Sequence, residues 1–207
     1  MNIVISLLTI AVIPLLLIKT FSSIDKDIGE EIKCSRKDIF IIILVAICYI
    51  EITRLFSFET SRFVNMSILT GYLVFMSYTD QKTKLLYSII SILMIILETT
   101  WLFIVLNSVS FTEYDLLLII VVLAMIIMSR LGFLGFGDVL IYIVIIIYEL
   151  IYSLLPFWDI LINYTIANIL FVVITGIKKV ITNNNDKKQP FTLCIAISTF
   201  LCNLLLF

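Results

Sequence analysis

Two aspartates, Asp80 and Asp138, have the sequence context of a catalytic pair. Each lies at the edge of a long apolar run, where a carboxylate is costly and usually marks function. Two carboxylates that come close together cannot both ionise cheaply, so they tend to share one proton. The ionised member can then act as a general base on water, while the protonated member polarises a peptide carbonyl and protonates the departing amine. This chemistry, which fits a membrane-embedded aspartic peptidase, needs neither histidine nor a metal ion.

The same two aspartates also have a purely structural interpretation. Asp80 could anchor its helix at the membrane interface or cap the next helix, and Asp138 could cap a helix that begins at Val139. The catalytic interpretation gains weight because Asp138 belongs to a Gly-x-Gly-Asp segment that contains Gly135 and Gly137. Glycine lets the backbone bend sharply and lets another backbone approach closely.

The composition is that of a polytopic membrane protein. Hydrophobic residues make up 62% of the 207 residues, and the mean hydropathy is +1.19. Soluble domains contain roughly 45–50% apolar residues. The chain has no basic patch with interleaved aromatic residues, which argues against a nucleic-acid partner. The first apolar run lacks a basic flank and a small-residue cleavage site, so we expect a retained helix rather than a signal peptide.

Eight apolar segments approach the roughly 20 residues that a membrane-spanning helix needs. They are residues 1–19, 39–57, 63–79, 85–106, 115–130, 139–155, 158–177 and 190–207. We therefore predict an all-α fold, a polytopic bundle of about eight transmembrane helices that forms a single domain over residues 1–207. A kink is expected at Pro14. The polar segment 20–38 is expected to be a short, solvated cytoplasmic loop, either a linker or a short surface helix.

The basic residues divide unequally between the two faces that eight spans would create. Twelve of the fourteen lie on one face, which the positive-inside rule assigns to the cytoplasm. These twelve are Lys19, Lys26, Lys33, Arg36, Lys37, Lys82, Lys84, Arg130, Lys178, Lys179, Lys187 and Lys188. The other face keeps Arg54 and Arg62. The asymmetry predicts that both termini lie outside, and it places Asp80 and Asp138 at the cytoplasmic ends of their helices.

The cysteines give no sign of a metal site. None of the four forms a Cys-x-x-Cys pair, and the chain contains no histidine. Because zinc sites are built mainly from cysteine and histidine, we expect no metal and no cofactor. Catalytic arrangements of the Ser–His or Cys–His kind are excluded as well.

The segment around the first aspartate resembles the prepilin peptidases. These enzymes are the leader peptidases of type IV pilins and pseudopilins, within the Gly-x-Gly-Asp group of membrane aspartic peptidases. The family tends to read Asp-x-x-Thr-x-x-Ile-Pro at this point, and Asp80, Thr83 and Leu86 fit the pattern. Tyr87 stands where the family has proline.

Two further segments resemble the same family. Residues 135–139, Gly-Phe-Gly-Asp-Val, fit its Gly-x-Gly-Asp-Val motif, although Leu140 replaces the usual lysine. Pro190 and Phe191 resemble the Pro-Phe start of the family's last helix. Larger family members carry a zinc-binding subdomain with paired Cys-x-x-Cys motifs in the first loop. Here that loop is the short segment 20–38, which holds a single cysteine.

The resemblance covers roughly residues 63–207 and implies an aspartic endopeptidase of the bacterial plasma membrane. It implies prepilin or pseudopilin-like partners that are cut after a glycine, at the cytoplasmic face and ahead of their hydrophobic helix. Pilus assembly, secretion and DNA uptake are all compatible with it. It assigns catalysis to Asp80 and Asp138. The residues to which it assigns substrate contacts are Gly135, Gly137, Pro190 and Phe191.

Two other functions remain open at this stage. Glu98 lies well inside an apolar run, so a small transporter could use it to relay protons or bind cations. A non-catalytic membrane partner would use both aspartates only as helix caps. Glu149 is expected to reach the membrane interface near the outer end of its helix.

Overall fold

The computed structural model describes residues 2–24, 34–54, 59–83, 88–105, 115–132, 134–182 and 191–205. Within these ranges every regular element is a helix and none is a strand, which confirms the all-α prediction. The chain divides into two compact units, which we describe separately. Unit 1 comprises Met1–Leu85 and Lys188–Ala196, and unit 2 comprises Leu86–Lys187 and Ile197–Phe207. The single domain over residues 1–207 stays a prediction.

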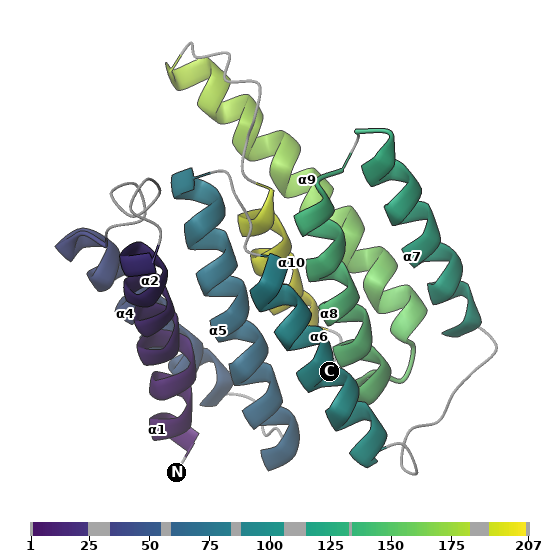
Figure 1. The fold of residues 1–207 in the computed structure, drawn as a ribbon, viewed down its shortest axis with the longest axis horizontal. Helices are drawn as coiled ribbons and strands as arrows, with labels where there is room; N and C mark the ends of the chain where they lie inside the picture. The colour runs from purple at the N-terminus through teal and green to yellow at the C-terminus, as the bar shows by residue number, and fades with distance from the viewer. Residues whose placement is uncertain are drawn as a thin grey trace. The chain divides into compact units, whose positions relative to one another are not determined.

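Unit 1 contains the N-terminal helices of the chain (Figure 1). In chain order they are α1 (Asn2–Leu7), the π-helical turn η1 (Leu8–Val12), α2 (Ile13–Ile24), α4 (Arg36–Arg54) and α5 (Thr60–Thr83). The helix α5 packs against α1, η1 and α2. The last helix of the chain, α10 (Thr192–Leu205), begins in unit 1, and the boundary between the units falls within it.

The π-helical turn lies just before Pro14, where the sequence predicted a kink; the kink itself stays a prediction. The N–H of Ile13 donates to the carbonyl of Leu8, five residues back, and proline has no N–H to offer. The carbonyl of Thr9 therefore has neither of its usual intrahelical donors, and it points at Gly71 of α5. A Cβ atom on Gly71 would lie 2.2 Å from this oxygen. Only glycine permits so close an approach of two backbones.

Unit 2 is organised around α8 (Phe136–Tyr152). This helix packs against α6 (Ser88–Val105), α7 (Asp115–Arg130) and α9 (Pro156–Thr182), as Figure 1 shows. A helix that is apolar on all sides is stable when it is buried on all sides, and most of α8 is buried. Its largest fully buried side chains are Tyr142, Tyr148, Ile141 and Ile145.

A helix is present at each of the eight predicted apolar segments, with ends that differ by a few residues. In the described part of the chain, three helical stretches are long and apolar enough to cross a membrane, namely Val4–Ser23, Ser88–Val105 and Pro156–Lys178. The number of spans stays a prediction.

The polar segment 20–38, predicted as a linker or short surface helix, is helical at both ends. Its first part is helical, since α2 continues to Ile24. The hydroxyl groups of Thr20, Ser22 and Ser23 donate to carbonyls of the preceding turn, which lets polar side chains remain in a helix. Phe21 also packs against Phe75 of α5, with ring centroids 6.0 Å apart. Residues 25–33 lie outside the described part of the chain.

Candidate active site

Asp80 lies near the end of α5 and caps a helix that is distant in sequence. It is buried, with 8% of its surface exposed. Its Oδ2 atom accepts a hydrogen bond from the backbone N–H of Thr192, at a distance of 3.1 Å. The backbone N–H of Phe191 and the hydroxyl of Thr192 donate to the same carboxylate. The carboxylate therefore satisfies N–H groups at the start of α10, which a helix leaves without intrahelical partners.

Burial and hydrogen bonding act on the charge of Asp80 in opposite directions. Burial raises its pKa, because removal from water penalises the ionised form. The donors from Thr192 and Phe191 lower the pKa, but burial has the larger influence and the pKa is raised overall. Asp80 therefore keeps its proton to a higher pH than an exposed aspartate, a property common among residues that exchange protons.

This arrangement brings together Asp80 and Phe191, two residues that carry the family resemblance. The contact joins positions 112 residues apart, Asp80 and Thr192. Sequence analysis missed Thr192, although a threonine at the start of an apolar helix is a common capping signal. Three other positions of the resemblance, Leu86, Tyr87 and Pro190, lie outside the described residues.

Asp138 occupies a different setting, in the first turn of α8. The helix begins at Phe136 after Gly135, which has an extended backbone with φ −68° and ψ 140°. The expectation of a helix that begins at Val139 was therefore wrong by one turn, and Asp138 is the third helical residue. Acidic residues are favoured at this position because they reach back to the helix start and face its positive dipole. The Asp138 side chain is half-buried.

Gly135 makes room for the carboxylate of Asp138. A Cβ atom on Gly135 would lie 2.7 Å from Oδ2 of Asp138, closer than two such atoms can approach. Gly137 is the second residue of the helix. Gly132 has φ +80° and follows the end of α7, where the left-handed region favours glycine. The glycines at 132 and 135 thus have separate roles, one in ending a helix and one in placing a carboxylate.

The two aspartates belong to different units, Asp80 to unit 1 and Asp138 to unit 2. Their pairing stays a prediction. Leu140, which stands where the family has lysine, is buried within α8.

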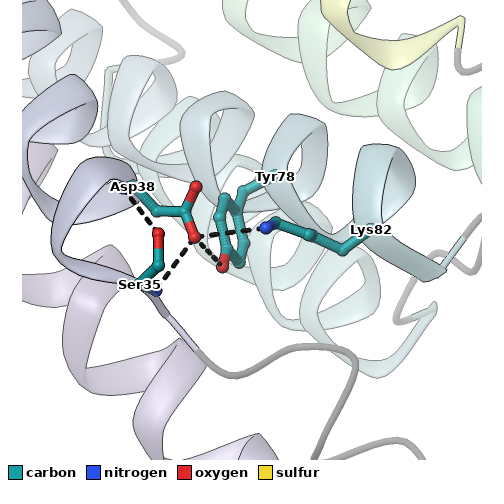
Figure 2. Close-up of polar contacts among 4 residues, drawn as sticks. All are labelled: Ser35, Asp38, Tyr78 and Lys82. Atoms are coloured by element: carbon teal, nitrogen blue, oxygen red, sulfur yellow. Dashed lines mark hydrogen bonds and ion pairs between the residues drawn. The ribbon is translucent and has the colours of Figure 1, made fainter.

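A second polar cluster joins α4 to the end of α5 (Figure 2) and consists of Ser35, Asp38, Tyr78 and Lys82. Tyr78 and Lys82 lie close to Asp80 in sequence. Oδ2 of Asp38 accepts hydrogen bonds from the Ser35 backbone N–H at 2.9 Å and from the Tyr78 hydroxyl at 3.3 Å. The ammonium group of Lys82 lies 3.2 Å from the same oxygen. Sequence analysis named Lys82 as a cytoplasmic basic residue but did not predict this cluster.

The charge of Asp38 is stabilised within this cluster. Burial by itself would raise its pKa, but hydrogen bonds from Ser35 and the charge of Lys82 outweigh that influence and lower the pKa overall. Asp38 also shares a reciprocal cap with Ser35, whose hydroxyl accepts the Asp38 N–H at 3.3 Å. The cluster fixes the start of α4 against α5 only a few residues from Asp80.

Unit 2 contains several buried polar side chains. Glu98 is completely buried in α6, and Glu149 is 3% exposed in α8. The expectation that Glu149 reaches the membrane interface was wrong, because α8 is covered by its neighbours to its last turn. Asn163 of α9 bonds two hydroxyl groups of α10, those of Ser198 at 2.8 Å and Thr199 at 2.9 Å.

Among the described residues, no group of three or more histidine, cysteine, aspartate or glutamate side chains could hold a metal ion. Comparisons with protein-family models, curated proteins and solved structures gave no match for this chain.

Proposed function

We propose that this protein is a membrane-embedded aspartic endopeptidase that removes the short basic leader from type IV prepilins or pseudopilin-like proteins. The observation that carries the proposal is the buried carboxylate of Asp80, which lies against the backbone of Phe191. A carboxylate held out of water at the end of an apolar helix is costly and commonly functional. Asp80 and Phe191 both belong to segments that resemble the prepilin peptidases, and they contact each other at this carboxylate.

The proposed enzyme spans the bacterial plasma membrane about eight times, with both termini outside. The distribution of basic residues supports this orientation. Both Asp80 and Asp138 would then lie at the cytoplasmic boundary, where water is available and the bilayer forms a wall of low dielectric constant. The substrate's apolar helix would enter from the bilayer, with its basic leader in the cytoplasm.

In the proposed reaction, Asp80 and Asp138 share one proton. The ionised carboxylate removes a proton from water as the water oxygen attacks the carbonyl carbon of the scissile peptide bond. The protonated carboxyl donates a hydrogen bond to the carbonyl oxygen and then transfers its proton to the departing nitrogen. The C–N bond breaks to give a carboxylic acid and an amine, and the pair again shares one proton.

The proposed substrate contacts lie beside the two carboxylates in sequence. Gly135 and Gly137 flank the start of α8 and would let the substrate backbone approach Asp138 closely. Phe191, and Pro190 before it, would lie along the substrate near Asp80. The resemblance to prepilin peptidases supports these four assignments.

Asparagine substitutions separate catalysis from helix capping. Asparagine caps helices about as well as aspartate, but it cannot act as a general base. We expect Asp80→Asn and Asp138→Asn each to reduce cleavage of a co-expressed prepilin at least about 100-fold, measured as loss of the leader-sized mass shift. Glu51→Gln, which alters an exposed carboxylate of α4, is the matched control and should cleave normally.

Normal cleavage by either asparagine variant would remove the pair from the mechanism. If the wild-type chain cuts no prepilin and both variants accumulate normally, the aspartates are helix caps in a non-catalytic membrane partner.

A second candidate function, transport of protons or cations, is favoured by the complete burial of Glu98 in α6. Ionisable residues inside membrane bundles often line ion pathways. Glu98→Gln should abolish proton-coupled ion uptake into proteoliposomes if the protein is a transporter. It should leave prepilin cleavage within about twofold of the wild type if the protein is a peptidase.

A further inference from the structure

We propose that Thr192 is a positioning residue for Asp80, and that its two donors stabilise the ionised form of this carboxylate against the effect of burial. This inference rests on the proposed function, which by itself does not say what holds the Asp80 carboxylate in place.

All the hydrogen-bond donors that surround Asp80 favour its ionised form over its protonated form. Two backbone N–H groups and one hydroxyl converge on it. An amide N–H can only donate, so both amides gain most when the carboxyl group has lost its proton. The positive end of the α10 dipole acts in the same sense. Three donors on one buried carboxylate also fix the direction in which its remaining lone pairs point.

Thr192 supplies two of these three donors. Its side chain is completely buried, so its hydroxyl has no competing contact with bulk water. It is also the first residue of α10, and this position holds its N–H in the direction of Asp80. Thr192 therefore makes the orientation of the Asp80 carboxylate depend on the position of the first turn of α10.

Among the described residues, few other charged groups lie close to Asp80. The thiol of Cys194, in the first turn of α10, interacts electrostatically with Asp80. On α1, η1 and α2, which pack against α5, the charged residue is Lys19, and it is exposed. Lys82, on α5 itself, pairs with Asp38. The hydrogen bonds from α10 are therefore the contacts through which substitution should change the protonation of Asp80.

Three substitutions at Thr192 test the inference in graded steps. Thr192→Val removes the hydroxyl and keeps the backbone N–H. Thr192→Pro removes both donors, at a first helical position where proline is tolerated. Thr192→Ser keeps both donors and is the conservative control. We expect the acidic limb of the pH profile of prepilin cleavage to move upward by about one pH unit in the valine variant. In the proline variant the acidic limb should move further upward, and in the serine variant it should lie where it does in the wild type.

A measurement that does not depend on cleavage keeps the two proposals distinguishable. In full-length protein that carries Asp138→Asn, pH-difference infrared spectra with and without Asp80→Asn isolate the carboxyl band of Asp80. Its titration midpoint should rise in Thr192→Val and further in Thr192→Pro. Unchanged midpoints in both variants would overturn the inference, even if the wild type cleaves prepilin. Shifted midpoints without any cleavage by the wild type would instead contradict the proposed peptidase.

Discussion

The two aspartates of the proposed pair are held in place by different kinds of contact. Asp80 is buried, and its hydrogen bonds come from a helix that begins 112 residues later in the sequence. Asp138 is half-buried in the first turn of its own helix, and its place depends on the absence of a side chain at Gly135. One carboxylate is positioned by contacts with a distant helix, whereas the other needs a glycine three positions earlier in the sequence. Mutations far from the site should therefore affect Asp80 much more than Asp138.

The largest effect is expected from Gly71→Ala, which should disturb unit 1 and spare the turn at Asp138. The new methyl group would lie 2.2 Å from the Thr9 carbonyl, and backbone atoms must move to admit it. Overpacking of this kind costs about 1–3 kcal/mol, and a backbone obstacle belongs at the upper end. Thermal unfolding of the purified protein should show the loss of stability. Amide exchange should increase at Phe191–Cys194 and remain unchanged at the start of α8.

Gly176→Ala is the matched control for this substitution. Gly176 lies on an exposed part of α9 with nothing within 4 Å of an added Cβ atom. Alanine there should be neutral or slightly stabilising, since it favours helix more than glycine does. Equal stability of the two alanine variants would mean that α5 and η1 do not pack as described.

A smaller effect, confined to Asp138, is expected from Gly135→Ala. The Cβ atom would displace the Asp138 carboxylate from its position over the helix start, 2.7 Å away. We expect the rate of prepilin cleavage to fall about tenfold, which corresponds to roughly 1.4 kcal/mol in the barrier. Because the obstacle is the end of a side chain rather than backbone, unfolding should change by only about 1 kcal/mol. Full cleavage activity in this variant would show that the place of Asp138 does not depend on Gly135.

The smallest effect is expected from the ion pair beside Asp80. Asp38 is stabilised in its charged form by Ser35 and Lys82, and Lys82 is 38% exposed. Solvent screening therefore limits the pair to less than about 1 kcal/mol. Lys82→Met should lower the stability by that amount at pH 7, whereas Lys37→Met, at an exposed position of α4, should not.

The pH dependence of this difference follows from the sign of the shift. The pKa of Asp38 is lowered in the folded protein, so its contribution to stability is fully present above the unfolded value, which is about 3.9. The contribution is lost as the pH falls through the lower folded-state pKa. Unfolding midpoints of Lys82→Met and the wild type should therefore converge below about pH 4. A difference that persists below the folded-state pKa of Asp38, where its carboxylate is protonated in both states, would assign the effect of Lys82 to packing of its aliphatic chain.

The start of the helix that carries Asp138 was predicted to within about one turn. A turn rich in glycine before an apolar run indicated that Asp138 lies at a helix start, and the error was one helical turn. The wider setting of Glu149 was misjudged, because hydropathy shows that a helix is apolar and does not show how far its neighbours cover it. The cap that Asp80 provides for the start of α10 also escaped notice, since the sequence does not reveal which distant carboxylate will accept the Thr192 N–H.

The sequence by itself determined the all-helical class, the eight apolar helical segments and a proline without an N–H at position 14. These features follow from patterns within a few turns of the chain, where hydrophobic side chains and the missing N–H of proline act directly. Only the tertiary structure decided that Asp80 meets α10, that Gly71 receives the carbonyl of Thr9 and that Asp38 meets Lys82. Each of these contacts joins residues from different helices. They form because burying the helices brings polar groups together, and a buried polar group must find a partner wherever packing supplies one.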